Sequence, residues 1–421
     1  MWKRLDGLIE QRQDQLIGLV QRLVQTPSIS GDENAYQLLL AEEMRQIGLE
    51  VDLWYPAEEE IKQHPAYKMV DARGMEGRPG LVGKLPGAEG NGSRSLTINC
   101  HADVVPPGDL ETWTYPPFAA EIANGRIYGR GACDMKANTA VGLYVLKLLR
   151  EIGYQPVGEI QFHSVIGEET GGLGALYSIV RGYKTAAAII LEPTELEIVP
   201  AQAGAATFRL TIPGKAAHGC MRDEGVNPIE KFIRLHTALL ELERERNRKF
   251  VHPFFEGIAN KIPLSIGTIN AGVWHSSVPD QLVAEGRYGV MVGETIEEAM
   301  AEFEACVQQV CAGDEWLREN PAVVEWIDGQ FESAAVRQDE PILQHLQQCY
   351  RDVFGKEPQL LGVTYGSDAR LLVNHAHIPT VLFGAGNIEA AHAADEYVPI
   401  EQLVPMAKTL ARLIVSWCGQ V

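Results

Sequence analysis

Apolar residues along the first part of the chain follow two alternating patterns. Segments with helical spacing of their apolar positions alternate with short, continuous apolar runs up to about residue 203. An alternation of this kind is typical of a doubly wound α/β layer with a mostly parallel sheet. The runs predict strands at 95–99, 159–166 and 186–191, and the periodic segments predict helices at 33–47, 137–152 and 174–180.

The first 28 residues carry apolar side chains at helical spacing with charged residues between them. This pattern predicts an amphipathic helix. The segment has neither a continuous apolar run nor a small-residue cleavage site, so we do not interpret it as a signal peptide. Nor does the chain contain an apolar run long enough to span a bilayer.

The pattern changes after about Gln202. Strands are predicted at 207–212, 264–269, 281–292 and 323–326, and helices at 227–245 and 296–311. The order β-α-β-β-α-β is the signature of a ferredoxin-like α+β domain. The α/β pattern returns from about residue 329, with a helix near 342–354 and a strand at 380–383. We therefore predict a discontinuous catalytic domain, residues 1–203 and 329–421, interrupted by an inserted domain, residues 204–328.

Length and charge agree with this picture. A chain of 421 residues exceeds the size at which a single core keeps growing, so two domains are expected. The formal net charge of −20 argues against nucleic acid and anionic membranes as partners, since both attract basic surfaces. Solubility explains the acidic balance, although carboxylates gathered around cations can account for part of it.

Seven cysteines are scattered along the chain in an odd number, without the spacing of a zinc ribbon. This usage favours reduced thiols and a cytoplasmic location. Two of them, Cys100 and Cys133, flank candidate metal ligands, and we interpret both as small buried residues.

Candidate chemistry lies in five short segments, each at a junction between a strand and a loop. In chain order they contain His101 with Asp103, Asp134, Glu168 with Glu169, Glu192, and His392. Ligands of open α/β sheets collect at the carboxyl ends of the strands, where loops from several strands converge. The combination predicts a hydrolytic site with two metal ions, although no single segment would.

Each segment also has a structural explanation. His101 could be a hydrogen-bonded loop histidine, and Asp103 is close enough to orient a metal-bound imidazole through a carboxylate or carbonyl oxygen. Asp134 precedes a helix that a carboxylate would cap, a role compatible with metal binding. Glutamate pairs such as Glu168 and Glu169 are common in first helical turns, but one can bind metal while the other acts as a base.

The remaining segments are less distinctive when taken singly. Glu192 ends an apolar strand, and Pro193 prevents further strand pairing there. His392 lies in a glycine- and alanine-rich loop late in the chain. A rival His-x-His pair, His375 and His377, has a less glycine-rich context.

Together these motifs resemble the co-catalytic zinc amidohydrolases, a family that includes acetylornithine deacetylase, succinyl-diaminopimelate desuccinylase, aminoacylase and glutamate carboxypeptidase. The resemblance spans nearly the whole chain. It implies a general base, Glu168, an orienting residue for His101, Asp103, and a cis peptide bond after Asp134. The metal ligands that it implies are His101 and Glu192 for one ion, Glu169 and His392 for the other, and Asp134 as a bridge between them.

Charge balance supports this arrangement. Two divalent cations would be neutralised by three carboxylates and a hydroxide, with two neutral imidazoles completing the ligand shells. Nitrogen and oxygen donors without thiolate suit Zn²⁺, with Co²⁺ and Mn²⁺ as alternatives.

The resemblance also assigns residues beyond the metal centre. It implies that His218, in the inserted domain, stabilises the reacting carbonyl oxygen from a partner subunit, which makes the inserted domain a lid and dimerisation domain of a homodimer. From the sequence alone, His218 would be a polar loop residue. Substrate binding is implied for Ser367, Arg370 and Arg287, although Arg370 could instead pair with Asp368.

The function predicted is hydrolysis of a linear amide in a small N-acyl amino acid or related amine, as in acetylornithine deacetylase. The alternatives are deformylation of an N-formyl aminopyrimidine, desuccinylation of succinyl-diaminopimelate, and cleavage of a dipeptide or a carboxy-terminal residue. Ser277 stands where some desuccinylases carry asparagine, which weakens the desuccinylase reading. A non-catalytic binding protein would have lost a ligand or the base, and none is missing.

Overall fold

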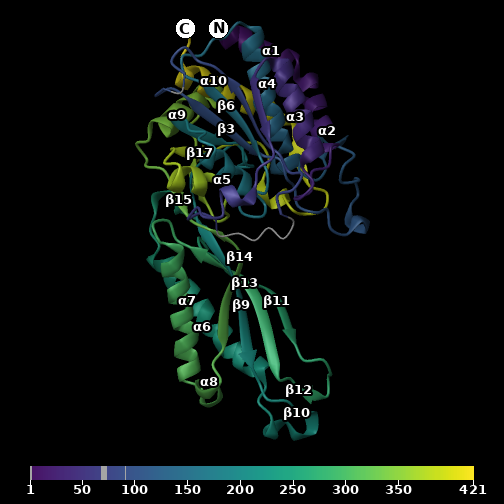
Figure 1. Ribbon diagram of the computed structural model, residues 1–421, viewed down its shortest axis with the longest axis vertical. Helices are drawn as coiled ribbons and strands as arrows, with labels where there is room; N and C mark the ends of the chain where they lie inside the picture. Colours follow the sequence, from purple (N-terminus) through teal and green to yellow (C-terminus); the bar gives the residue numbers. More distant parts are fainter. Residues whose placement is uncertain (1, 68–73, 91) are drawn as a thin grey trace. The chain divides into compact units, whose positions relative to one another are not determined.

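The computed structural model describes residues 2–67, 74–90 and 92–421, and Met1, the first residue of the predicted amino-terminal helix, lies outside these ranges. The chain divides into two compact units (Figure 1). The first unit comprises residues 1–200, 335–361 and 367–421, and the second comprises residues 201–334 and 362–366. The sequence places these boundaries at 203/204 and 328/329. The short segment 362–366 groups with the second unit, although the sequence pattern predicts that it belongs to the catalytic domain.

A mixed sheet organises the first unit, in the order β1-β2-β6-β3-β7-β17-β8-β15, with β16 paired to β8. The four strands β6, β3, β7 and β17 run parallel to one another, as the apolar runs predict. At both sides the sheet is antiparallel, since β2 pairs antiparallel with β1 and β6, and β8 with β17. The strands are β1 Glu50–Trp54, β2 Gly80–Leu85, β3 Leu96–His101, β6 Ile160–Val165, β7 Ala187–Ile190, β8 Ile198–Gln202, β15 Ala334–Ala335, β16 Leu360–Val363 and β17 Thr380–Leu382.

Helices cover both faces of this sheet. The helix α4 packs so closely on Phe162 of β6 that a Cβ built at Gly142 would lie 2.6 Å from its ring. A Cβ at Gly174, in α5, would lie 3.0 Å from Cβ of Val165. Phe162 and Val165 point to opposite faces of the strand, because side chains alternate along it. The layer is therefore doubly wound. Its helices are α1 Trp2–Gln11, α2 Gln13–Val24, α3 Asn34–Ile47, α4 Ala137–Glu151, α5 Leu173–Val180, α9 Pro341–Phe354 and α10 Ile400–Cys418.

The amino-terminal segment differs from the single helix that was predicted. It forms two helices, α1 and α2, that are interrupted at Arg12, whose backbone is not helical (φ −111°, ψ 21°). The apolar positions of both helices are buried, including Leu5 and Ile9 in α1 and Leu16 and Val20 in α2. Amphipathic spacing thus identifies the buried face correctly but does not reveal the break.

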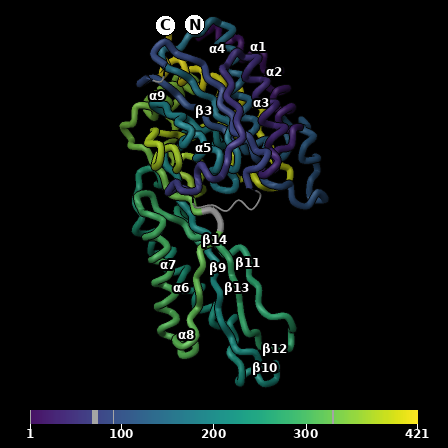
Figure 2. The backbone as a smooth tube through the Cα atoms, in the orientation of Figure 1, coloured from purple at the N-terminus to yellow at the C-terminus, as the bar shows by residue number. Residues whose placement is uncertain are grey.

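A small antiparallel sheet, β18-β5-β4, lies beside the candidate site in the first unit. It brings Tyr397–Pro399 (β18) onto Arg126–Tyr128 (β5), which pairs in turn with Glu121–Ala123 (β4). Segments that are far apart in the sequence therefore pair in this sheet. Figure 2 shows the course of the backbone.

The second unit has the strand order β11-β13-β9-β14, and all its pairings are antiparallel. Along the chain the elements follow the predicted β-α-β-β-α-β order, with a short extra helix, α8. They are β9 Gly204–Pro213, α6 Pro228–Lys249, β11 Leu264–Ala271, β13 Gln281–Val290, α7 Ile296–Ala312, α8 Glu315–Glu319 and β14 Val323–Phe331, with the small pair β10 Ala217–His218 and β12 Ser277–Val278.

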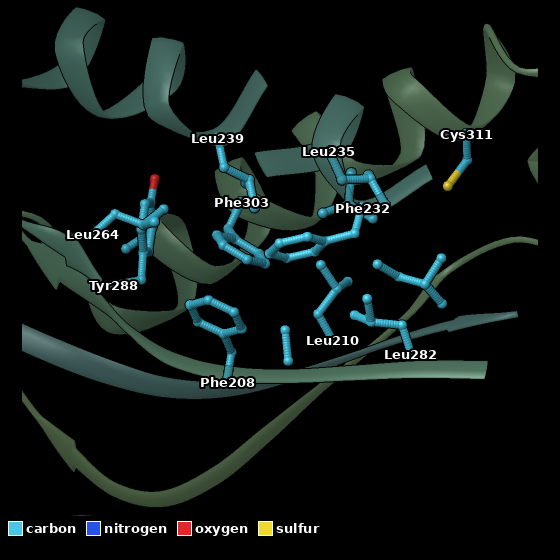
Figure 3. Close-up of a cluster of buried hydrophobic side chains, with 14 of the residues drawn as sticks. Phe208, Leu210, Phe232, Leu235, Leu239, Leu264, Leu282, Tyr288, Phe303 and Cys311 are labelled. Carbon is cyan, nitrogen blue, oxygen red and sulfur yellow. The ribbon is translucent and has the colours of Figure 1, made fainter. Parts of the chain in front are cut away.

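The core of the second unit lies between its helices and its sheet (Figure 3). Phe208 of β9 packs against Phe303 of α7, with ring centroids 4.6 Å apart, and Tyr288 of β13 contacts the same ring edge-on at 5.1 Å. Leu235 and Leu239 of α6 complete this cluster and are fully buried. The unit thus has its own hydrophobic core.

Across the described residues, none of the helices combines the length and apolar character needed to cross a membrane.

Candidate metal centre

The parallel strands bring three of the predicted segments to the same edge of the sheet. His101 is the last residue of β3, Glu168 and Glu169 follow β6, and Glu192 follows β7. In register, His101 lies opposite Val165 of β6. Because these strands are parallel, the loops after them must meet, as the sequence analysis expects.

Asp134 reaches the centre from the segment that leads into α4. Gly131, just before it, has a left-handed backbone (φ +80°), and a Cβ there would lie 2.6 Å from the side chain of Val104. Glycine is therefore required at this close approach. The peptide bond from Asp134 to Met135 is cis, as the resemblance implies.

His392 comes from a loop late in the chain. Its backbone is left-handed (φ 62°), which is uncommon for a residue with a side chain. Its imidazole is 53% exposed, whereas the side chains of the other four predicted ligands are less than 10% exposed. His392 is thus the exposed member of a buried group.

The carboxylate of Asp134 lies between the two imidazoles. His101 Nε2 is 2.8 Å from Asp134 Oδ1, and His392 Nε2 is 3.6 Å from Asp134 Oδ2. Glu192 Oε2 lies 3.9 Å from His101 Nε2, and Glu169 Oε2 lies 3.0 Å from His392 Nε2. Each imidazole therefore has one glutamate of its own and shares Asp134 with the other.

Burial and mutual repulsion govern the acidity of the glutamates. Burial raises the pKa of Glu168 well above its usual value, and the nearby charges of Glu192 and Asp368 raise it further. Burial likewise raises the pKa of Glu192, with Asp134 as the next cause, and the pKa of Glu169. Carboxylates are crowded here beyond what the surrounding protein neutralises.

The pKa values of the other predicted ligands, Asp134, His101 and His392, shift so that the charged form of each side chain is favoured. Burial opposes the charged form of Asp134, but hydrogen bonds from His101 and His392 hold its pKa below the usual range. Burial also opposes protonation of His101, yet the hydrogen bond to Asp134 leaves its pKa well above normal. Hydrogen bonds to Asp134 and Glu169 raise the pKa of His392 to about 10.

The chemistry of these residues fits a site for divalent metal. The potential ligand atoms of His101, Asp134 and Glu169 lie within 4.8 Å of one another. Among the residues that the structure describes, no side chain donates a hydrogen bond to the carboxylates of Glu168 or Glu192. Buried carboxylates and imidazoles without thiolate form a donor set that suits zinc and related ions.

The main chain and the side chain of Asp103 make different contacts. The backbone carbonyl of Asp103, not its side chain, lies 2.8 Å from His101 Nδ1, and Oδ1 of the side chain is 3.9 Å away. The carboxylate instead accepts hydrogen bonds from the backbone N–H groups of Glu168 and Glu169, both at 3.1 Å, and from the hydroxyl of Ser30. Asp103 therefore orients the imidazole through its main chain and holds the glutamate loop through its side chain.

Ser367 and Arg370 lie in the first unit and are almost fully buried. The guanidinium of Arg370 donates to the carbonyl of Gly171, in the loop that carries the two glutamates. Asp368 accepts a hydrogen bond from Asn99 of β3 at 3.3 Å, and burial raises its pKa to about 6. This segment contacts the loops of the metal centre, so Arg370 supports the glutamate loop.

Two predicted site residues belong to the second unit. Arg287, in β13, donates to the carbonyl of Thr364 at 3.0 Å, and burial lowers its pKa. His218 is exposed, and its Nδ1 accepts a hydrogen bond from the backbone N–H of Cys220 at 3.2 Å. This bond leaves Nε2 as the nitrogen that can carry a proton and donate.

The remaining histidines and the cysteines do not belong to the predicted ligand set. His163 is buried in β6, accepts or donates a hydrogen bond with Gln161 at 3.0 Å, and has a pKa lowered by burial to about 3. The ring of His375 faces that of His64 at 5.6 Å. Cys100 and Cys133 are buried, and all seven cysteines are free thiols.

Sequence reasoning missed Arg130 and Glu396. The buried carboxylate of Glu396 pairs with Arg130 and accepts hydrogen bonds from the backbone N–H groups of Cys133 and Asp134. Both residues lie inside motifs that were recognised, one in Gly129-Arg-Gly and one four residues after His392. The only signal available was their proximity to predicted ligands.

Comparisons with known proteins agree with this geometry. The model of the family described as peptidase family M20/M25/M40 matches residues 97–416. An N-formyl-4-amino-5-aminomethyl-2-methylpyrimidine deformylase of Bacillus subtilis (strain 168) is 29% identical over 439 residues, which cover 99% of this chain and 97% of that protein. A succinyl-diaminopimelate desuccinylase of Bradyrhizobium sp. (strain ORS 278) is 27% identical over 335 residues, covering 74% and 80% of the two chains.

The fold also resembles that of solved structures. The YXEP protein of Bacillus subtilis, a dinuclear metal-binding peptidase, matches with a TM-score of 0.65 at 18% identity, over 97% of this chain and 99% of the other. At this level of identity the likeness concerns the fold.

Proposed function

This chain belongs to the peptidase family M20/M25/M40, and on that premise we propose that it is a two-metal hydrolase that removes the formyl group from an N-formyl aminopyrimidine. The family resemblance expected from the motifs is confirmed, and the chain is a hydrolase of that family. The crowding of Asp134, Glu169 and two histidines at one edge of the sheet is the observation that carries the reaction type.

The choice of substrate rests on how much of each relative the chain matches. Similarity to the deformylase extends over 99% of this chain, and similarity to the desuccinylase over 74%. Agreement over nearly the whole length includes the second unit, whereas the desuccinylase match leaves about a quarter of this chain unmatched. This favours the formyl group over the acetyl group of an acetylornithine deacetylase, the first choice from the sequence, which stays a prediction.

In this proposal the two cations are held as the motifs imply. His101 and Glu192 would hold one, Glu169 and His392 the other, and Asp134 both. Two divalent ions in such a site polarise an amide carbonyl and lower the pKa of a bound water toward neutrality. Zn²⁺ suits these donors best, and Co²⁺ and Mn²⁺ remain alternatives.

Glu168 supplies the proton transfers. Its carboxylate is buried beside the ligands, and no described residue donates a hydrogen bond to it. As general base it would take a proton from water at Oε1 or Oε2 and later give it to the departing amine nitrogen. The amide C–N bond breaks, water provides a hydroxyl to the carbon, and formate and a free amine leave.

The backbone holds Glu168 in position for this role. The carboxylate of Asp103 accepts the N–H groups of Glu168 and Glu169, and Arg370 anchors the next turn through Gly171. A loop fixed at three points keeps a base within a fraction of an ångström of its place, which proton transfer requires.

We further infer that two copies of the chain associate through the second unit. The strand β11 is an edge strand with exposed residues such as Ile269, and Trp274 in the following turn is 63% exposed. Edge strands with exposed apolar residues are favoured places for strand pairing between chains. In such a homodimer His218 would donate from Nε2 to the carbonyl oxygen in the partner's site.

A substrate panel tests the proposal. Purified protein freed of metal and then loaded with Zn²⁺, Co²⁺ or Mn²⁺ is incubated with formyl, acetyl and succinyl amides and a dipeptide, and amine release is measured. We expect the highest kcat/KM for N-formyl aminopyrimidine. A higher value for another acyl group would overturn the substrate, and no metal-dependent hydrolysis of any amide would overturn the reaction.

A further inference from the structure

Glu396 is a buried carboxylate that no part of the proposed chemistry uses. Only 1% of the residue is exposed. Its Oε1 accepts hydrogen bonds from the backbone N–H groups of Cys133 at 2.9 Å and Asp134 at 3.0 Å, while its Oε2 pairs with the guanidinium of Arg130. The carboxylate of Glu396 therefore holds the segment that carries Asp134, the ligand predicted to bridge both cations.

The loop that bears His392 ends at this same residue and needs an anchor. Both His392 and Asp395 have left-handed backbones, with φ of 62° and 55°. Such conformations cost of order 1 kcal/mol each and persist only where the surroundings impose them. The imidazole of His392 is half exposed, so packing around the ring does little to hold it.

The main chain on both sides of Glu396 is tied to the Asp134 segment. The carbonyl of Glu396 accepts the N–H of Gly129 at 2.8 Å. Directly after it, β18 pairs with β5, Tyr397 opposite Tyr128. The side chain and the main chain of Glu396 thus fasten the His392 loop to the residues around Asp134.

We propose that Glu396, braced by Arg130, is a positioning residue that fixes His392 relative to Asp134 and thereby sets the affinity for the second cation. The inference rests on the two-metal site of the proposed function. His101 and Glu192, which would hold the other cation, come from β3 and from the loop after β7, and their placement does not depend on this loop.

A glutamine at position 396 cannot replace the carboxylate. The site presents hydrogen-bond donors on both sides, two backbone N–H groups and the guanidinium of Arg130. A carboxylate accepts on both oxygens, whereas an amide has one acceptor and one donor group. In either orientation E396Q therefore sets a donor against a donor and loosens the loop without changing its size.

The test measures cation binding in two steps. Metal-free wild type, E396Q and D6N are titrated with Zn²⁺ against a chelator of known affinity, and bound metal per chain is counted. We expect E396Q to bind the second ion about 10- to 100-fold more weakly, as is usual when a group supporting a ligand is lost. The first ion should lose less affinity, because His101 still lies 2.8 Å from Asp134. Excess Zn²⁺ should then restore its turnover.

D6N is the matched control. Asp6 forms a partly buried bidentate pair with Arg412 in the same unit, at 2.7 and 2.8 Å, remote from the ligands in the sequence. Its loss should lower the melting temperature while leaving both zinc affinities at the wild-type values. A general loss of stability would affect E396Q and D6N alike, so it would not reproduce the split between the two ions.

The outcomes separate the two proposals. If wild type binds fewer than two ions, the two-metal function fails. If wild type binds two and E396Q holds both as tightly, the role of Glu396 is overturned. Should E396Q fail to fold, R130K answers the same question, because lysine keeps the charge but not the planar guanidinium that braces Glu396. Unchanged second-ion affinity in R130K would likewise overturn it.

Discussion

At the scale of single residues, the proposed function gives two adjacent glutamates different roles. Glu169 lies 3.0 Å from His392, with which it would hold the proposed second cation, whereas no described residue donates a hydrogen bond to the carboxylate of Glu168. Both backbone N–H groups are held by Asp103. The proposed ligand and the proposed base are therefore neighbours on one loop that Asp103 fixes.

Replacing Glu168 with glutamine should remove the base and keep the metals. We expect E168Q to retain two ions per chain and to lose about 10²- to 10⁴-fold in kcat, the usual contribution of general acid–base catalysis. Elemental analysis and steady-state kinetics measure the two effects. A variant with wild-type kcat would show that another group takes the proton.

His163 predicts a specific dependence of stability on pH. Its pKa is about 3 in the folded chain because of burial, against about 6.5 when exposed. Between these values the unfolded chain binds a proton that the folded chain does not. The free energy of unfolding should therefore fall as pH drops below 6.5, by up to about 1.4 kcal/mol per pH unit from this residue.

Chemical denaturation of the whole protein at pH 7.5, 6.5 and 5.5 measures how the free energy of unfolding depends on pH. H163N should be less stable at pH 7.5 but lose less stability on acidification than wild type. H275N, at an exposed histidine of the second unit, serves as the control and should follow wild type. Equal pH dependence for H163N and wild type would rule out the contribution of His163.

The residues of the centre were predictable from sequence because each follows an apolar strand or precedes a helix in a glycine-rich segment. Glu396 was not, since its role depends on a contact with Arg130, 266 positions away in the chain. For Asp103 the sequence indicated an orienting role for His101 but could not choose between its carboxylate and its carbonyl. Hydrogen-bond geometry is needed for both.

At the scale of elements, local signals marked most helices and the central strands. The helix α7 illustrates this, because Thr295 and Glu298 form a capping box, with Thr295 Oγ1 accepting the N–H of Glu298 and the Glu298 carboxylate accepting the N–H of Thr295. Such contacts lie within four residues and are legible in sequence. The antiparallel strands β1 and β2, at one side of the sheet, were not assigned, because their pairing depends on distant partners.

Loss of this cap should weaken the second unit alone. We expect T295A to lower its free energy of unfolding by about 1 kcal/mol, since the backbone N–H of Glu298 loses its acceptor, Thr295 Oγ1. T295S, which keeps the hydroxyl, is the control. Denaturant unfolding followed by the fluorescence of tryptophans in this unit, Trp274, Trp316 and Trp326, measures it. Equal stability of T295A and wild type would contradict the role of the cap.

At the scale of the whole molecule, the proposed dimer predicts that two defective chains can repair each other. E168Q lacks the base and H218A lacks the donor from the second unit. If His218 acts across the dimer, each mixed dimer regains one complete site, and random pairing should restore about a quarter of wild-type activity.

Co-expression of the two variants with separate affinity tags isolates the mixed dimer for assay. Either variant alone should be nearly inactive. If the mixed dimer is no more active than the two variants measured separately, His218 does not act in the partner's site. If analytical ultracentrifugation finds only a monomer, the proposed dimer is overturned.

The position of β17 has a consequence for how the protein is made. This strand, Thr380–Leu382, lies in the sheet between β7 and β8, although both precede it by the entire second unit. During translation the ribosome releases β7 and β8 long before the strand that joins them, while the second unit, nearly continuous in sequence, can fold as it emerges. The sheet of the first unit therefore lacks the strand between β7 and β8 until synthesis is almost finished, and the apolar strand edges that β17 will cover stay unpaired until then. Nascent chains halted before Thr380 should accordingly be captured by chaperones or degraded.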